Sequence, residues 1–66
     1  MTIYQELKEA NCKLDNHESD LLVKADVASR AILYKYRKEH KVTAFWSETD
    51  QEFWYDIPFA YDPFWQ

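Results

Sequence analysis

One short stretch of the chain combines side chains that enzymes use for chemistry. Residues Asn16-His17-Glu18-Ser19-Asp20 supply an imidazole, a hydroxyl and two carboxylates, and Cys12 lies four residues before them. Thiolate, imidazole and carboxylate groups are zinc ligands, and a hydroxyl or thiol beside an imidazole is typical of nucleophilic sites. A small enzyme or metal site around His17 is therefore one hypothesis for this protein.

The spacing within this stretch completes no catalytic motif. His17 and the glutamate after it begin like the zinc-protease motif, but Leu21 stands where the second histidine would be. A metal held by Cys12, His17 and Asp20 would need a fourth ligand from elsewhere, and the sequence has one other histidine, His40. We therefore favour an assignment with no catalytic residue, no metal and no cofactor.

The same residues fit a structural role in a chain reversal. Asp15 or Asn16 would shape the turn, Ser19 or Asp20 would cap it, and His17 would hydrogen-bond across to the sheet. The chain contains no glycine, which excludes a glycine-rich phosphate loop. Backbone positions with positive φ must then fall to asparagine or aspartate, and the candidates are Asn11, Asp15, Asn16 and Asp50.

Length and composition limit the class of protein. Sixty-six residues allow one small domain, 1–66, with one core. The formal charge of −4 argues against direct nucleic-acid binding, and no apolar run is long enough to span a membrane. The first residues do not form a signal peptide, and the single Cys12 cannot form an internal disulfide. We therefore expect a cytoplasmic protein.

Two helices are predicted from apolar spacing and capping residues. The first spans Thr2 to about Leu14, with Thr2 and Gln5 at the spacing of a capping box. Its single apolar stripe consists of Ile3, Leu7, Ala10 and Leu14. Asp26 is the predicted N-cap of a second helix that runs to about Glu39. The cations near its end could bind phosphate, but cations at a helix C-terminus usually complement the helix dipole.

Strands are predicted where β-branched and aromatic residues concentrate. Residues 42–46 and 53–57 flank a polar connection and predict an antiparallel hairpin, which Pro58 ends. Because an isolated hairpin is marginal in water, residues 21–24 are expected to supply a third strand. The fold class is then α+β, with two helices packed on a small antiparallel sheet and an aromatic C-terminal tail.

Aromatic and acidic residues concentrate in the last part of the chain. Residues 42–66 contain nine of the twelve aromatic residues and five acids, but no Lys or Arg. A chain this short needs most of its aromatic side chains to form a stable core, so only two or three of them remain to contact a partner. In the tail, Phe59 and Tyr61 are expected inside and Phe64 and Trp65 at the rim. The candidate partner-binding residues are Trp46, Trp54, Asp56, Tyr61, Asp62, Phe64 and Trp65.

Two segments carry a resemblance to known sequences. The stretches 15–23 (DNHESDLLV) and 53–65 (FWYDIPFAYDPFW) resemble a group of very short hypothetical proteins of bacterial and phage genomes. The resemblance spans essentially the whole chain but implies no activity. Asp50-Gln51 stands where such proteins carry a glycine in the hairpin turn. An origin in mobile elements would favour a small inhibitor or modulator of a host protein.

The leading functional hypothesis is a non-enzymatic protein-binding module. Its acidic, aromatic hairpin and tail would dock on a larger protein with a basic surface. One alternative is an anti-defence protein that mimics nucleic acid with its carboxylates, and the other is the small enzyme or metal site around His17. The sequence leaves the oligomeric state open.

Overall fold

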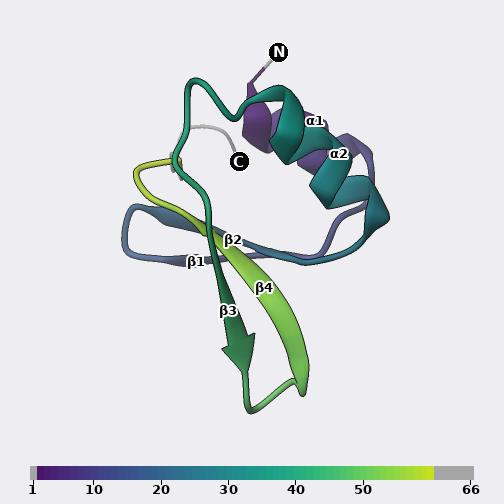
Figure 1. Ribbon diagram of the computed structural model, residues 1–66, viewed down its shortest axis with the longest axis vertical. Coiled ribbons are helices and arrows are strands. Elements are labelled where there is room, and N and C mark those ends of the chain that lie inside the picture. The colour runs from purple at the N-terminus through teal and green to yellow at the C-terminus, as the bar shows by residue number, and fades with distance from the viewer. Residues whose placement is uncertain (1, 61–66) are drawn as a thin grey trace.

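The computed structural model describes residues 2–60, which form two helices and four strands. In chain order these are α1 (Ile3–Glu9), β1 (Leu14–His17), β2 (Asp20–Lys24), α2 (Val27–Lys35), β3 (Thr43–Ser47) and β4 (Glu52–Ile57). The strands form one antiparallel sheet in the order β1-β2-β4-β3, and both helices lie on one side of it (Figure 1). The predicted α+β class is confirmed, including a strand over residues 21–24.

The first helix begins as predicted and ends earlier. The Thr2 hydroxyl accepts a hydrogen bond from the Gln5 backbone, and the Gln5 side chain accepts one from the Thr2 backbone. At the other end, Asn11 has φ 61°. The Asn11 N–H donates to the Lys8 carbonyl, and the Cys12 N–H donates to the Leu7 carbonyl. These paired bonds satisfy the last carbonyls of α1, with asparagine where most proteins place glycine.

The missed strand β1 occupies the predicted end of this helix and the predicted turn. Leu14 matched the apolar stripe, but it pairs with Val23 across the β1–β2 hairpin. Asn16 lies within β1, opposite Leu21, and not in a turn. The reversal comes two residues later, where Glu18 takes φ 58° between the paired His17 and Asp20. Strand pairing, which sequence periodicity does not report, decides this assignment.

The second helix has the predicted N-cap and a shorter body. The Asp26 side chain accepts from the Ser29 N–H, and the Ser29 hydroxyl accepts from the Asp26 N–H. The helix was expected to reach Glu39 but ends at Lys35, after which residues 36–39 form turns. There the Tyr36 and Arg37 N–H groups donate to carbonyls only three residues back. This spacing is tighter than the four-residue spacing of an α-helix, so the α-helix ends here.

The core lies between the helices and one face of the sheet. Inward-facing strand residues Leu21, Val23 and Ile57 are fully buried against Ile3 and Leu7 of α1. We call this face of the sheet the helix-side face, and the alternating residues place Leu22, Trp54 and Asp56 on the opposite, open face. No helix within residues 2–60 has the length and apolar content that a membrane span requires.

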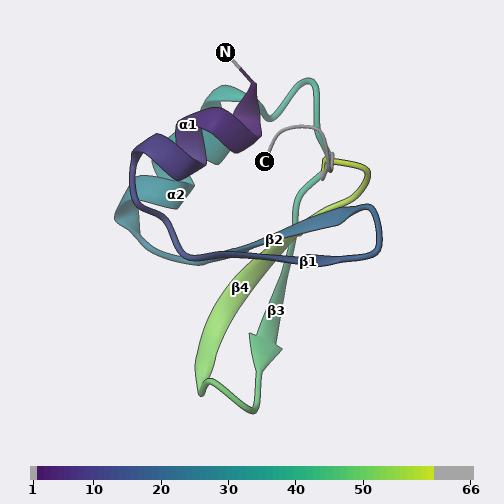
Figure 2. The same ribbon diagram turned by 180° about the vertical axis from the view of Figure 1, so that it is seen from behind.

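The β3–β4 hairpin extends beyond the helices. Its tip, between Ser47 and Glu52, lies far from both helices, and the β1–β2 hairpin crosses its other end (Figures 1 and 2). The connection turns at Gln51 with φ 56°, and not at Asp50 as the glycine-free sequence predicted. Because the outer half of this hairpin has no helix above it, its side chains face solvent on that side.

Candidate functional site

An exposed aromatic pair marks the outer half of the β3–β4 hairpin. Trp46 and Phe53 lie directly opposite each other in the register of the two strands. Their rings make an edge-to-face contact, with centroids 5.0 Å apart and planes at 73°. Trp46 is 47% exposed and Phe53 is 55% exposed. Two rings that order each other and remain open to solvent form a rigid apolar surface suited to a partner.

Trp54, also predicted as a partner contact, is buried. It is 5% exposed, although it lies on the open face of the sheet and outside the main core cluster. Lys24 pairs with Trp54 across β2 and β4, and the Lys13 ammonium lies 5.7 Å from the centre of the indole ring. The two lysines therefore lie on the side of the sheet where Trp54 would otherwise face solvent, and long lysine side chains can shield an aromatic ring from water. Burial of the ring does not favour Trp54 as an anchor for a partner, and the position of Lys13 beside it was not foreseen.

Glu52 holds the two covering lysines in place. Its carboxylate lies 3.1 Å from Lys24 Nζ and 3.8 Å from Lys13 Nζ. The hydrogen bond from Lys24 lowers the pKa of Glu52, and the charges of both lysines and the Trp54 indole act in the same direction against the effect of burial. Glu52 is therefore committed to its own chain and adds no free negative charge to the hairpin surface.

The free acids of the described hairpin lie at its tip. Glu48 and Asp50 are both exposed in the β3–β4 connection. The Asp50 N–H and the Asp50 carboxylate both hydrogen-bond the Ser47 hydroxyl, at 3.3 and 3.2 Å. These bonds hold one acid in place directly beside the strand that carries Trp46. The tip thus offers negative charge within reach of the aromatic pair.

Strand β3 lies at the edge of the sheet. It pairs with β4 on one side, and within residues 2–60 no strand pairs with its other edge. Phe45, on the open face beside Trp54, is 36% exposed, and four of the five β3 residues are exposed. An uncovered edge next to exposed rings is a feature that can pair with an extended segment of another protein.

Asp56 occupies a different place from the aromatic pair. It is half-buried on the open face near the inner end of β4, where Leu22 lies opposite. Burial raises the pKa of Asp56, and the neighbouring Asp20 carboxyl raises it further, while His17 acts in the opposite direction. The structure therefore does not bring Asp56 together with Trp46.

The cluster around His17 lies at the β1–β2 turn. Asn16, His17 and Ser19 are exposed, and Asp20 is half-buried. The Asp20 carboxylate was expected to cap its own turn, but it accepts a hydrogen bond from the Phe59 N–H at 3.3 Å. It thereby fixes the turn that follows β4. Within residues 2–60, no three His, Cys, Asp or Glu side chains are placed to hold a metal ion.

Cys12, between α1 and β1, is buried in the core cluster. Burial raises the pKa of the Cys12 thiol, and the negative charge of Asp26 adds to the rise. A raised pKa keeps the sulfur protonated and disfavours both metal binding and nucleophilic attack at neutral pH. Cys12 therefore acts as a small core residue.

The C-terminal tail contributes one described aromatic residue. Phe59 was expected inside, but it is 84% exposed with φ 60°, in the turn that Asp20 fixes. Ala60, the next residue, is fully buried and fills the position instead. The predicted contacts Tyr61, Asp62, Phe64 and Trp65 lie outside the described residues.

Sequence reasoning missed Phe53 and Phe45 as exposed rings. Phe53 alternates with Tyr55 and Ile57 along β4, so it has the pattern of a core residue. Only the short helices, which end before the outer half of the hairpin, leave it exposed (Figure 1). The sequence signal that could have identified Phe53 as exposed is its position close to the hairpin connection.

Comparisons with known proteins add no relative. No family model, no curated protein and no solved structure matches this chain. Its function must therefore be argued from its own surfaces.

Proposed function

We propose that the protein is a non-enzymatic binding module that docks on a larger protein through the outer half of the β3–β4 hairpin. The observation that carries this proposal is the ordered, exposed pair of Trp46 and Phe53. Aromatic residues of this kind dominate the energy of protein interfaces because they bury a large area at a small cost in side-chain entropy.

The fold supports this use of the hairpin. Core packing holds the inner end of β4 through Ile57, while the outer end carries the aromatic pair away from the helices. A partner could then contact both rings and the open edge of β3 without disturbing the core. The predicted tail contacts Phe64 and Trp65 remain part of the proposal.

The charge of the hairpin favours a basic partner. Glu48 and Asp50 are exposed at the tip, and residues 42–66 contain no Lys or Arg to oppose them. Such a surface attracts arginine and lysine side chains, which can pair with carboxylates and stack on the rings. Nucleic-acid mimicry needs a denser row of free acids, and Glu52 and Asp56 do not supply them.

The proposal is tested by capture followed by a measured affinity. The full chain is immobilised, a partner is isolated from a bacterial lysate, and its dissociation constant is measured with the purified pair by calorimetry. We expect Trp46→Ala and Phe53→Ala each to weaken binding at least tenfold, as for interface hot spots. Raising the salt concentration should weaken binding further, because the free acids are at the surface.

A matched control separates docking from general loss of surface hydrophobicity. Val27 is 81% exposed at the start of α2, so Val27→Ala removes an exposed apolar side chain away from the hairpin. This variant should bind like the unmodified chain. The proposal fails if Trp46→Ala and Phe53→Ala retain the original affinity, or if Val27→Ala loses as much as they do. Trp65→Ala tests the tail contribution in the same assay.

A further inference from the structure

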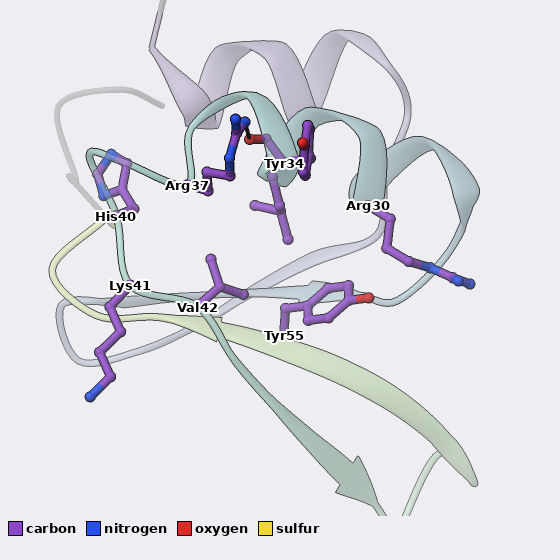
Figure 3. Close-up of a pocket in the computed structure, with 8 residues that line it drawn as sticks. Arg30, Tyr34, Arg37, His40, Lys41, Val42 and Tyr55 are labelled. Atoms are coloured by element: carbon purple, nitrogen blue, oxygen red, sulfur yellow. Dashed lines mark hydrogen bonds between the residues drawn. The ribbon is translucent and has the colours of Figure 1, made fainter.

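A second surface with different chemistry lies between α2 and the sheet. A cavity of about 480 Å³ opens between α2, the connection that follows it and the helix-side face of β4. Leu33 of the helix lines this space. Val42 and Tyr55 line it from the sheet side (Figure 3). A volume of this order admits a small molecule and not a folded partner. The two rings of the docking surface, Trp46 and Phe53, do not line it.

The cavity has a positive lining in a negatively charged protein. Arg30, Arg37, His40 and Lys41 all contribute to its wall, and none of the Asp and Glu residues within 2–60 does. In Figure 3, Arg30 and Lys41 extend outward at the two ends of the opening, and His40 lies at the upper end. The whole chain carries a net charge of −4, so the grouping of positively charged side chains around the cavity does not come from an excess of Lys and Arg in the chain.

These cations differ from three other cations of the chain in their partners. Lys13 and Lys24 pair with Glu52, and Lys35 pairs with Glu6. In the described part of the chain, no carboxylate lies within ion-pair distance of Arg30, Arg37 or Lys41. A helix dipole does not account for all of them, because Arg30 lies within α2 and Lys41 lies six residues beyond its end.

Arg37 is held in a defined position at the mouth of the cavity. Its guanidinium lies 3.9 Å from the centre of the Tyr34 ring, and its Nη1 donates to the Tyr34 carbonyl oxygen at 2.7 Å (Figure 3). This bond uses one of the five N–H donors of the side chain, so the others can reach a ligand. A stacked guanidinium loses little entropy on binding and suits a planar, bidentate anion.

We propose that this cavity binds a small organic anion, an apolar planar ring that bears a phosphate or carboxylate group. The ring would lie against Leu33, Val42 and Tyr55, and the anionic group would meet Arg37 at the mouth. Arg30 and Lys41 would add attraction from the two ends of the opening. This proposal goes beyond the docking function, because it concerns a different surface and a different class of ligand.

A titration with defined probes tests the site in the full chain. Amide resonances are followed by NMR as 1-naphthyl phosphate, 1-naphthoate, 1-naphthol or inorganic phosphate is added. We expect saturable shifts centred on Leu33, Val42 and Tyr55 with one or both ring anions. Neutral 1-naphthol and ring-free inorganic phosphate should bind at least tenfold more weakly. The stronger of the two ring anions shows whether the site prefers phosphate or carboxylate.

Variants of matched charge decide whether the cavity cations are responsible. Arg37→Gln and Lys41→Gln should each weaken ring-anion binding at least fivefold. Lys38→Gln removes the same charge from an exposed residue that does not line the cavity, and it should leave the affinity unchanged. Equal losses in all three variants would overturn the proposal, and so would equal binding of 1-naphthol or shifts confined to Trp46 and Phe53.

Discussion

Aromatic side chains on the helix-side face of the β3–β4 hairpin are more exposed than an aromatic side chain on its open face, which is the opposite of what the position of the helices would predict. On the helix-side face, Trp46 and Phe53 are about half exposed, because the helices end before the outer half of the hairpin. On the open face, where no helix packs, Trp54 is 5% exposed. Lys24 lies opposite it on the neighbouring strand β2, and the Lys13 ammonium, before β1, lies over its ring. The face of a strand does not decide burial by itself; the position along the strand and the cross-strand neighbours also do.

The largest test of this comparison is truncation of the two tryptophans. Trp54→Ala should lower the free energy of unfolding by about 3–4 kcal/mol, because it empties a buried site. Trp46→Ala should lower it by less than about 1 kcal/mol, because its ring is half exposed. Urea unfolding followed by far-UV circular dichroism measures both. Equal losses for the two variants would show that the lysine cover does not bury Trp54 in solution.

A smaller loss of stability is expected from truncating Lys24, which lies opposite Trp54 on β2. Lys24→Ala should cost about 1 kcal/mol, since it removes both the long side chain opposite Trp54 and the ion pair with Glu52. Quenching of tryptophan fluorescence by acrylamide should increase in this variant. Lys38→Ala, at an exposed position without a carboxylate partner among the described residues, is the control and should change neither property. Unchanged quenching in Lys24→Ala would contradict the role of this side chain.

Two carboxyl groups on the open face, one near each end of β4, have pKa values that are shifted in opposite directions. Glu52 faces lysines, which lower its pKa, whereas Asp56 faces Asp20 and is buried, which raises its pKa. A carboxyl whose pKa is raised on folding stabilises the fold below its unfolded pKa and loses that contribution as the pH rises through its folded pKa. Asp56→Asn should therefore increase the free energy of unfolding at pH 7.

The pH dependence of Asp56→Asn separates this effect from a change in packing. The gain should disappear below the usual pKa of aspartate, 3.8, where the carboxyl is neutral in both states. Chemical unfolding at pH 3 and pH 7 measures the difference. Glu48→Gln, at an exposed position on the hairpin tip, should be close to neutral at both pH values. A gain for Asp56→Asn that is the same at both pH values would contradict the raised pKa.

Local signals predicted much of the fold. The capping pair Thr2–Gln5, the N-cap Asp26, the aromatic strands of the β3–β4 hairpin and the end of β4 before Pro58 all depend on neighbouring residues. Of the candidate site, Trp46 was predicted and is exposed, while Phe53 was missed and Trp54 is buried. These two outcomes share a cause, because each concerns contact with a segment distant in the sequence.

The amino-acid sequence alone determined where helices begin, which segments favour strands and that the last third is acidic and aromatic, since these properties arise within a few residues. Tertiary structure decided that residues 14–17 become a strand, because pairing with β2 outweighs the helical stripe that Leu14 extends. It also decided which rings are covered and which cations surround the cavity below α2. Those outcomes depend on strand register and helix length, which bring distant side chains together only in the folded chain.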